Sequence, residues 1–149
     1  MELSSNSKSS YLNKITYVNL RWIGVIGQFI TINVVAFLLK FEFNFLLANI
    51  IVLLGALSNI FLFYFFKKNQ LQEKISLIFL TLDIIQLSFL LYLTGGTINP
   101  FSIFLIIPSI FAANSLSIKT NILLIFLTIT SIILLTFFHE ELPSPLNKY

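Results

Sequence analysis

Gly95-Gly96-Thr97-Ile98-Asn99-Pro100-Phe101 is the stretch in which glycine, asparagine and proline gather between two long apolar runs. Gly95 can adopt the left-handed backbone conformation that ends a helix. Asn99 is a preferred helix N-cap, and Pro100 suits the first position of the helix that follows. The stretch therefore predicts a tight turn between two antiparallel helices.

On both sides of this turn the chain is strongly apolar. Its 149 residues are 57% hydrophobic and only 10% charged, whereas a soluble domain carries about 25% charged residues. Apolar runs of about 20 residues recur, and each can cross about 30 Å of hydrocarbon as a helix. Alternating strand patterns are absent from the sequence. We therefore predict an all-α fold, a polytopic helical membrane bundle with the lipid bilayer as a partner and no nucleic acid.

The apolar segments give a predicted domain organisation. Residues 1–19 are expected to form a cytoplasmic N-terminal segment, with a short interfacial helix at about residues 11–17. Residues 20–138 form the transmembrane domain, and residues 139–149 form an external tail or the loop before a further span. The predicted spans are about residues 20–39, 45–66, 75–94, 100–116 and 121–138.

Two of these spans have recognisable packing features. In the second span, Ala48, Val52, Gly55 and Asn59 share one helical face and predict a packing seam, because small residues let helices approach closely. In the fourth span, Pro108 predicts a mid-helix kink, because proline removes one backbone hydrogen bond.

The basic residues predict the orientation of the chain in a bacterial inner membrane. Positive charges favour the cytoplasmic side. A cytoplasmic N-terminus puts one large group of basic residues inside, and leaves Lys40 and Lys148 outside. It also places the Gly-Gly turn at the outer surface. The inner group is Lys8, Lys14, Arg21, Lys67, Lys68, Lys74 and Lys119.

Polar residues inside the spans are candidates for function or for helix contacts. Arg21 opens the first span, as an interface anchor or a ligand contact, and Gln28 follows on the face that carries Gly24 and Thr31. Asp83 lies near the middle of the third span, where an unpaired carboxylate is costly, about 2.5–3.5 kcal/mol on insertion scales. It is therefore protonated or paired. Three roles stay open: a tie to Gln86, a pair with Arg21, or a proton-linked group beside a ligand.

The turn has chemistry beyond that of a helix cap. Capping does not require the second glycine, Gly96, which allows close approach to the backbone. Backbone N–H groups, the Thr97 hydroxyl and the Asn99 amide lie at the positive end of a helix dipole. Phe101 and Phe104 provide an adjacent apolar surface. This combination suits an amphipathic ligand, either a quinone or a lipid headgroup. With no cysteine and only His139 as histidine, a Cys-based or His-rich metal site is excluded.

Residues 95–101 match the Gly-Gly-x-x-Asn-Pro-Phe signature of the Reg/Prr/Act-type redox-responsive sensor histidine kinases, which the chain resembles over about residues 20–145. Two flanking features are also similar to that family. One is Asp83 and Gln86 followed by Leu91-Tyr92-Leu93-Thr94, and the other is Leu20-Arg21-Trp22 followed by Gly27-Gln28. The resemblance implies a membrane domain that binds ubiquinone, or a related quinone, and regulates a cytoplasmic kinase. The implied binding residues are Gly95, Gly96, Asn99, Pro100 and Phe101. The chemistry of the turn adds Thr97 to the quinone-binding candidates, and Asp83, Gln86, Arg21 and Gln28 are candidate supporting polar residues.

The chain also departs from that family. The family has six spans followed by a phosphorylated-histidine helix and an ATP-binding domain. His139 does not sit in a phosphoacceptor context, and no nucleotide-binding motif or catalytic residue is present in the sequence. We expect a fragment of a longer homodimeric kinase, or a degenerate stand-alone domain, that reaches a response regulator only through a kinase core elsewhere. The alternatives are a fragment of a small membrane transporter and a structural dimerisation module without a ligand.

Overall fold

The structure, a computed structural model, describes residues 11–143, so the predictions for residues 1–10 and 144–149 lie outside the described residues. Within this range the chain is almost entirely helical, which confirms the all-α class. The elements are β1 (Tyr11–Asn13), α1 (Lys14–Asn33), the π-helical η1 (Val34–Leu38), α2 (Phe45–Phe65), β2 (Gln70–Gln72), α3 (Glu73–Tyr92), the 3₁₀ helices η2 (Gly96–Ile98) and η3 (Pro100–Ile106), α4 (Ile107–Ser115) and α5 (Ile118–Phe137).

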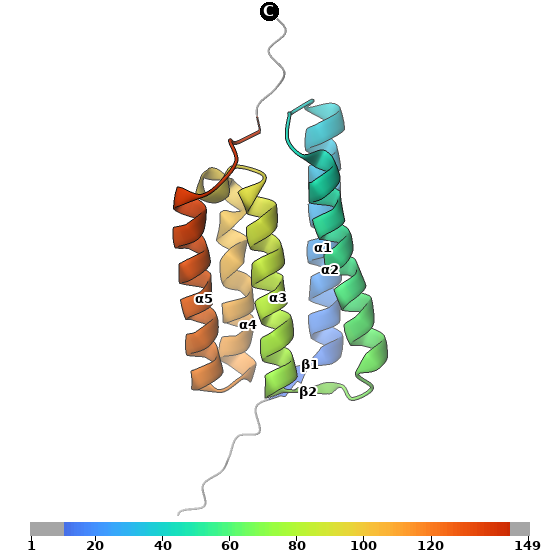
Figure 1. Cartoon of the computed structure of the whole chain (residues 1–149). Coiled ribbons are helices and arrows are strands. Elements are labelled where there is room, and N and C mark those ends of the chain that lie inside the picture. Colours follow the sequence, from blue (N-terminus) through green and yellow to red (C-terminus); the bar gives the residue numbers. More distant parts are fainter. Residues whose placement is uncertain (1–10, 144–149) are drawn as a thin grey trace, which may run out of the picture.

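The helices form two groups that stand side by side (Figure 1). One group is the α1–α2 hairpin, and the other contains α3, α4 and α5. The short strands β1 and β2 pair antiparallel at the end of the bundle where α3 begins, with Leu12 opposite Leu71. The turn at residues 95–101 lies at the other end of α3.

Within residues 11–143, four helical segments are long and apolar enough to cross a membrane. The fourth predicted span is shorter, and its residues are helical over Pro100–Ser115. Its first part, η3, is a 3₁₀ helix, which rises about 2.0 Å per residue against 1.5 Å in an α-helix. This segment therefore extends about 28 Å, close to the thickness of the hydrocarbon core. The long segments are Lys14–Leu38, Phe45–Phe65, Glu73–Tyr92 and Ile118–Phe137.

The expected interfacial helix at residues 11–17 is wrong, because residues 11–13 form strand β1. Helix α1 then begins at Lys14, six residues before the predicted span. Asn13 is the reason: its side chain accepts a hydrogen bond of 3.1 Å from the backbone N–H of Thr16 and caps the helix. Hydropathy locates the apolar part of a helix, whereas the cap determines where the helix begins.

The prediction of a mid-helix kink at Pro108 is also wrong, because Pro108 lies in the first turn of a helix. The backbone changes from 3₁₀ to α-helix at residues 106–107, which places Pro108 at the second position of α4. Proline is tolerated in a first helical turn, because the N–H that it lacks would have no intrahelical partner there.

The predicted seam of α2 is confirmed. Ala48, Val52, Gly55 and Asn59 are all buried. The Asn59 side chain donates a 3.1 Å hydrogen bond to the backbone carbonyl of Val18, which joins α2 to α1.

The α3–α4–α5 group has its own packed interior. Leu105, Ala112 and Leu124 are fully buried in it. The hydroxyls of Ser109 and Thr128 lie 3.2 Å apart and join α4 to α5. Buried residues of both groups also form one continuous core, and the candidate site lies where α1 faces α3 and the fourth span.

Candidate ligand cavity between the two helix groups

A cavity of about 730 Å³ lies between α1 and the facing side of α3, η3 and α4. Its walls come from residues 17–35 of α1 and η1, residues 80–94 of α3 and its end, and residues 99–111 of the fourth span. Leu142 and Pro143, which follow α5, line it beside the turn. This volume is within the range of small-molecule sites, about 300–1,000 Å³.

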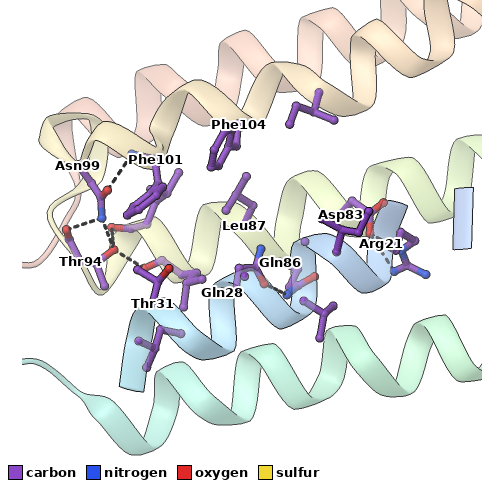
Figure 2. A pocket seen from close by; sticks show the side chains of 18 of the residues that line it. Arg21, Gln28, Thr31, Asp83, Gln86, Leu87, Thr94, Asn99, Phe101 and Phe104 are labelled. Atoms are coloured by element: carbon purple, nitrogen blue, oxygen red, sulfur yellow. Dashed lines mark hydrogen bonds and ion pairs between the residues drawn. The ribbon is translucent and has the colours of Figure 1, made fainter. Parts of the chain in front are cut away.

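Polar groups are present at three levels of this mainly apolar cavity, as Figure 2 shows. Asn99 and Thr94 lie at the end near the turn. Gln28 and Gln86 lie in the middle, and Arg21 and Asp83 lie at the far end. Asp83 and Thr94 are about 16 Å apart along the helical direction of α3. The cavity is therefore elongated and amphipathic.

The α1 wall is open because of two glycines. Gly24 and Gly27 both line the cavity, and a Cβ added at either position would have no atom within 4 Å. The sequence grouped Gly24 with Gln28 and Thr31 on one face, and all three line the cavity. Gly27 has the same role, three residues from Gly24.

Asp83 at the far end forms an ion pair with Arg21, with 2.8 Å between Nη2 of Arg21 and Oδ1 of Asp83. Nε of Arg21 also donates to Oδ1, at 2.8 Å. The Tyr17 hydroxyl donates to the other carboxylate oxygen. Of the three roles left open for Asp83, the structure therefore shows the pair with Arg21.

Arg21 itself is buried, with 8% of its surface exposed. It donates further hydrogen bonds to α2, at 2.6 Å to Oγ of Ser58 and at 3.4 Å to Oδ1 of Asn59. Its interpretation as an interface anchor is wrong, because its guanidinium joins α1, α2 and α3 inside the bundle. Tyr17 was missed by sequence reasoning, although its position four residues before Arg21 places both on one helical face.

Gln86 is not tied to Asp83, as one sequence interpretation held. Its Nε2 donates a 2.9 Å hydrogen bond to Oε1 of Gln28, so this amide pair joins α3 to α1 (Figure 2). The Gln86 side chain also packs against Gly55 of α2, where an added Cβ would lie 2.6 Å from its amide. Two glutamines predicted as supporting residues are therefore brought together inside the cavity.

The turn has the predicted capping geometry. Gly95 has φ of 103°, in the left-handed region. Asn99 caps η3, because its Oδ1 accepts a 2.9 Å hydrogen bond from the N–H of Phe101. Its Nδ2 donates to the Thr94 carbonyl at 3.0 Å and to the Thr94 hydroxyl at 2.9 Å. Pro100 occupies the first helical position. The fold itself therefore uses both polar atoms of the Asn99 side chain.

The structure divides the predicted turn residues into two sets. Asn99, Pro100 and Phe101 line the cavity, and the Phe101 ring lies 5.8 Å from that of Phe104. Gly95, Gly96 and Thr97 do not line the cavity. The Thr97 carbonyl accepts a 3.3 Å hydrogen bond from the Ser102 hydroxyl, within the turn itself.

The second glycine has a packing explanation. Gly96 has φ of 58°, and an added Cβ would lie 2.6 Å from the Leu135 carbonyl oxygen and 2.7 Å from His139. Close approach to this backbone therefore comes from the end of α5. Gly95 is similarly close to Leu142, at 2.6 Å from an added Cβ.

We therefore expect Gly96→Ala to destabilise the fold. The left-handed conformation alone disfavours alanine by about 1–2 kcal/mol, and the clash with the Leu135 carbonyl adds to this. Gly24→Ala is the matched control, because its Cβ enters open space. Thermal unfolding of both variants in nanodiscs measures the difference, and equal stability would contradict the packing role of Gly96.

Within residues 11–143, no group of three or more His, Cys, Asp or Glu side chains could hold a metal ion. Polar chemistry in the cavity therefore comes from amides, hydroxyls and one ion pair. Such groups recognise the oxygens of a small organic molecule by hydrogen bonds.

The fold defines a multi-pass helical membrane protein with an elongated, mainly apolar cavity between two groups of helices. The chain is similar to the sensor histidine kinase RegB of Cereibacter sphaeroides, with 30% identity over 141 residues. This match covers 94% of the chain and 30% of the length of that relative. It supports the resemblance to sensor histidine kinases. No protein-family model matches the chain, and no solved structure matches it.

Proposed function

We propose that the chain is the membrane sensory domain of a redox-responsive two-component histidine kinase and that it binds ubiquinone or a related quinone. The cavity between α1 and α3 carries this proposal, because Asn99, Pro100 and Phe101 line its end at the turn. The similarity to a sensor histidine kinase over nearly the whole chain supports the class of the parent protein.

The residues of the cavity fit a quinone. Phe101, Phe104 and Phe111 provide aromatic surface, and leucines and isoleucines surround the rest. Amide and hydroxyl groups from Gln28, Gln86 and Thr31 provide hydrogen-bond donors for ring oxygens. A bound quinone supplies reversible redox chemistry, and the chain's own residues bind it, orient it and exclude water.

The position of the cavity gives a physical basis for signalling. It lies between the two groups of helices, and an occupant of the cavity would contact both groups. A ligand shifts a conformational equilibrium only by its difference in affinity for the two states. Occupancy could therefore set the spacing between the α1–α2 hairpin and the α3–α5 group. A kinase core and a homodimeric partner would receive this change in the parent protein.

The transporter alternative is less well supported. It rests on Asp83 within a span and on a short, kinked fourth helix. The structure instead places the Asp83 carboxylate in hydrogen bonds with Arg21 and Tyr17. The location that accompanies the proposal is the bacterial inner membrane, with the N-terminus in the cytoplasm and the turn outside.

Binding of a short-chain ubiquinone to the chain in nanodiscs tests the proposal directly. We expect the parent chain to bind, and Phe101→Ala to raise Kd about tenfold through lost aromatic contact. Stability should change little, because Phe101 is 42% exposed and its capping contact uses the backbone. Phe126→Ala is the matched control: this ring on α5 is 66% exposed and does not line the cavity. No binding by the parent chain would overturn the proposed function.

A further inference from the structure

We propose that the polar recognition point of the cavity is the Gln28–Gln86 amide pair, with the Thr31 hydroxyl beside it, and that it takes an oxygen-bearing ring. The inference rests on the proposed function, and it places the quinone ring deeper than the turn. Gln86 precedes Thr94 by eight residues, or about 12 Å along α3. The turn then contacts a less polar part of the same ligand.

The first step concerns the donors at the turn. A quinone carbonyl oxygen can only accept hydrogen bonds, so it needs a free donor. Both hydrogens of the Asn99 amide are directed to Thr94, at its carbonyl and its hydroxyl. The Thr94 hydroxyl in turn donates to the Leu90 carbonyl at 2.9 Å. The side-chain donors of Asn99 and Thr94 are therefore already used within the fold.

The amide pair is different, because one hydrogen bond does not satisfy two glutamines. Nε2 of Gln86 donates to Oε1 of Gln28. Among residues 11–143, no protein group bonds to Nε2 of Gln28 or to Oε1 of Gln86. Either orientation of the pair leaves at least one donor and one acceptor free. Both side chains line the cavity, so these free groups are accessible to its occupant.

The position of the Gln86 side chain is fixed by its contact with Gly55 of α2. Its amide packs against the Cα of Gly55, where any side chain would displace it. Gly55 is buried, so this contact belongs to the packed seam between the helices. The amide pair is thus held at one place in the cavity, which is what recognition of a small ring requires.

Thr31 adds a second point of contact on α1. It lies three residues after Gln28, about 4.5 Å along the helix, on the same cavity-facing side. In the part of the chain that the structure describes, its hydroxyl forms no hydrogen bond. Two donors this close together can bond two neighbouring oxygens on one edge of a ring, such as a carbonyl and the adjacent methoxy group of ubiquinone. The three groups together therefore recognise the oxygen-bearing edge of a benzoquinone-type ring.

The test compares three near-isosteric variants, Gln28→Met, Gln86→Met and Thr31→Val, in full-chain nanodiscs titrated with a short-chain ubiquinone. We expect each variant to raise Kd about tenfold, because a ligand oxygen loses its partner. The matched control is Asn33→Leu. Asn33 joins α1 to α2 through a 3.3 Å hydrogen bond to Asn49 and does not line the cavity. It should leave Kd unchanged.

A second measurement locates the ring without relying on variants. A ubiquinone with a photoreactive azide on its ring should label the α1 segment around residues 24–31 in the parent chain. Labelling confined to residues 95–101, or unchanged Kd in all three variants while Phe101→Ala weakens binding, would overturn this inference and keep the proposed function. If the parent chain binds no quinone, both proposals fail together.

Discussion

Arg21→Met should lower the free energy of unfolding by about 3–5 kcal/mol, because it leaves the Asp83 carboxylate buried without its counter-charge. Arg21 makes contacts in three helices: α1, from which it comes, Ser58 and Asn59 on α2, and Asp83 on α3. The measurement is equilibrium unfolding in mixed micelles, read by circular dichroism.

The double variant Arg21→Met/Asp83→Leu is the decisive comparison. It removes both charges and should recover most of the stability, since an apolar pair can replace a buried ion pair. Lys68→Met is a control that removes a positive charge from the exposed loop before β2. A loss below about 1 kcal/mol for Arg21→Met, the range of exposed ion pairs, would contradict the buried link between the helix groups.

The predictable parts of the fold were those that depend on local chemistry. The order of glycine, asparagine and proline at residues 95–100 predicted the helix end, the N-cap and the first helical position. The spacing of small residues predicted the α2 seam. Each of these features depends on neighbours within one or two helical turns, and the structure confirms each of them.

The parts that could not be predicted depend on how whole helices are rotated and placed. Sequence analysis identified Arg21, Gln28, Asp83 and Gln86 as intramembrane polar residues. The pairing of arginine with aspartate, and of glutamine with glutamine, follows from the register of α1 against α3. A helical wheel places a residue on a face but does not show which residue lies opposite.

Gly96 shows the same limit at the turn. Its positive φ is a local feature, but its close neighbour is the end of α5, about forty residues later in the chain. The sequence interpretation assigned the close approach to a ligand, because no local signal shows that the chain itself returns there. Lys14 gives another case: the sequence predicts it on the inner side, and its hydrogen bond from Nζ to the Phe66 carbonyl at 2.5 Å could not be foreseen.

The position of α1 connects these observations. It packs closely against α2, whereas it faces α3 across a cavity that three polar links cross, from Tyr17, Arg21 and Gln28. Such links depend on distance and angle, and a change in the contents of the cavity would alter both. An apolar core joins the two groups of helices, and these hydrogen bonds connect them further along the candidate ligand cavity.

Filling this cavity should abolish ligand binding while the fold survives. The double variant Gly24→Leu/Gly27→Leu adds two side chains where an added Cβ meets no atom within 4 Å. Because they enter the empty space, they should leave the helix packing intact. They should raise the Kd for a short-chain ubiquinone at least about 10–100-fold, as an overpacked site does. Quinone titration in nanodiscs measures this change.

Gly24→Ala/Gly27→Ala is the matched control for the helix itself. Alanine favours a helix over glycine by about 1 kcal/mol per position, so this variant should be at least as stable as the parent chain. It adds little volume and should retain most of the binding. If the leucine variant binds quinone as tightly as the alanine variant, the ligand lies elsewhere. If both variants bind quinone weakly, the loss of affinity comes from the removal of glycine flexibility in α1 and not from the filled volume. The alanine variant leaves the cavity nearly empty.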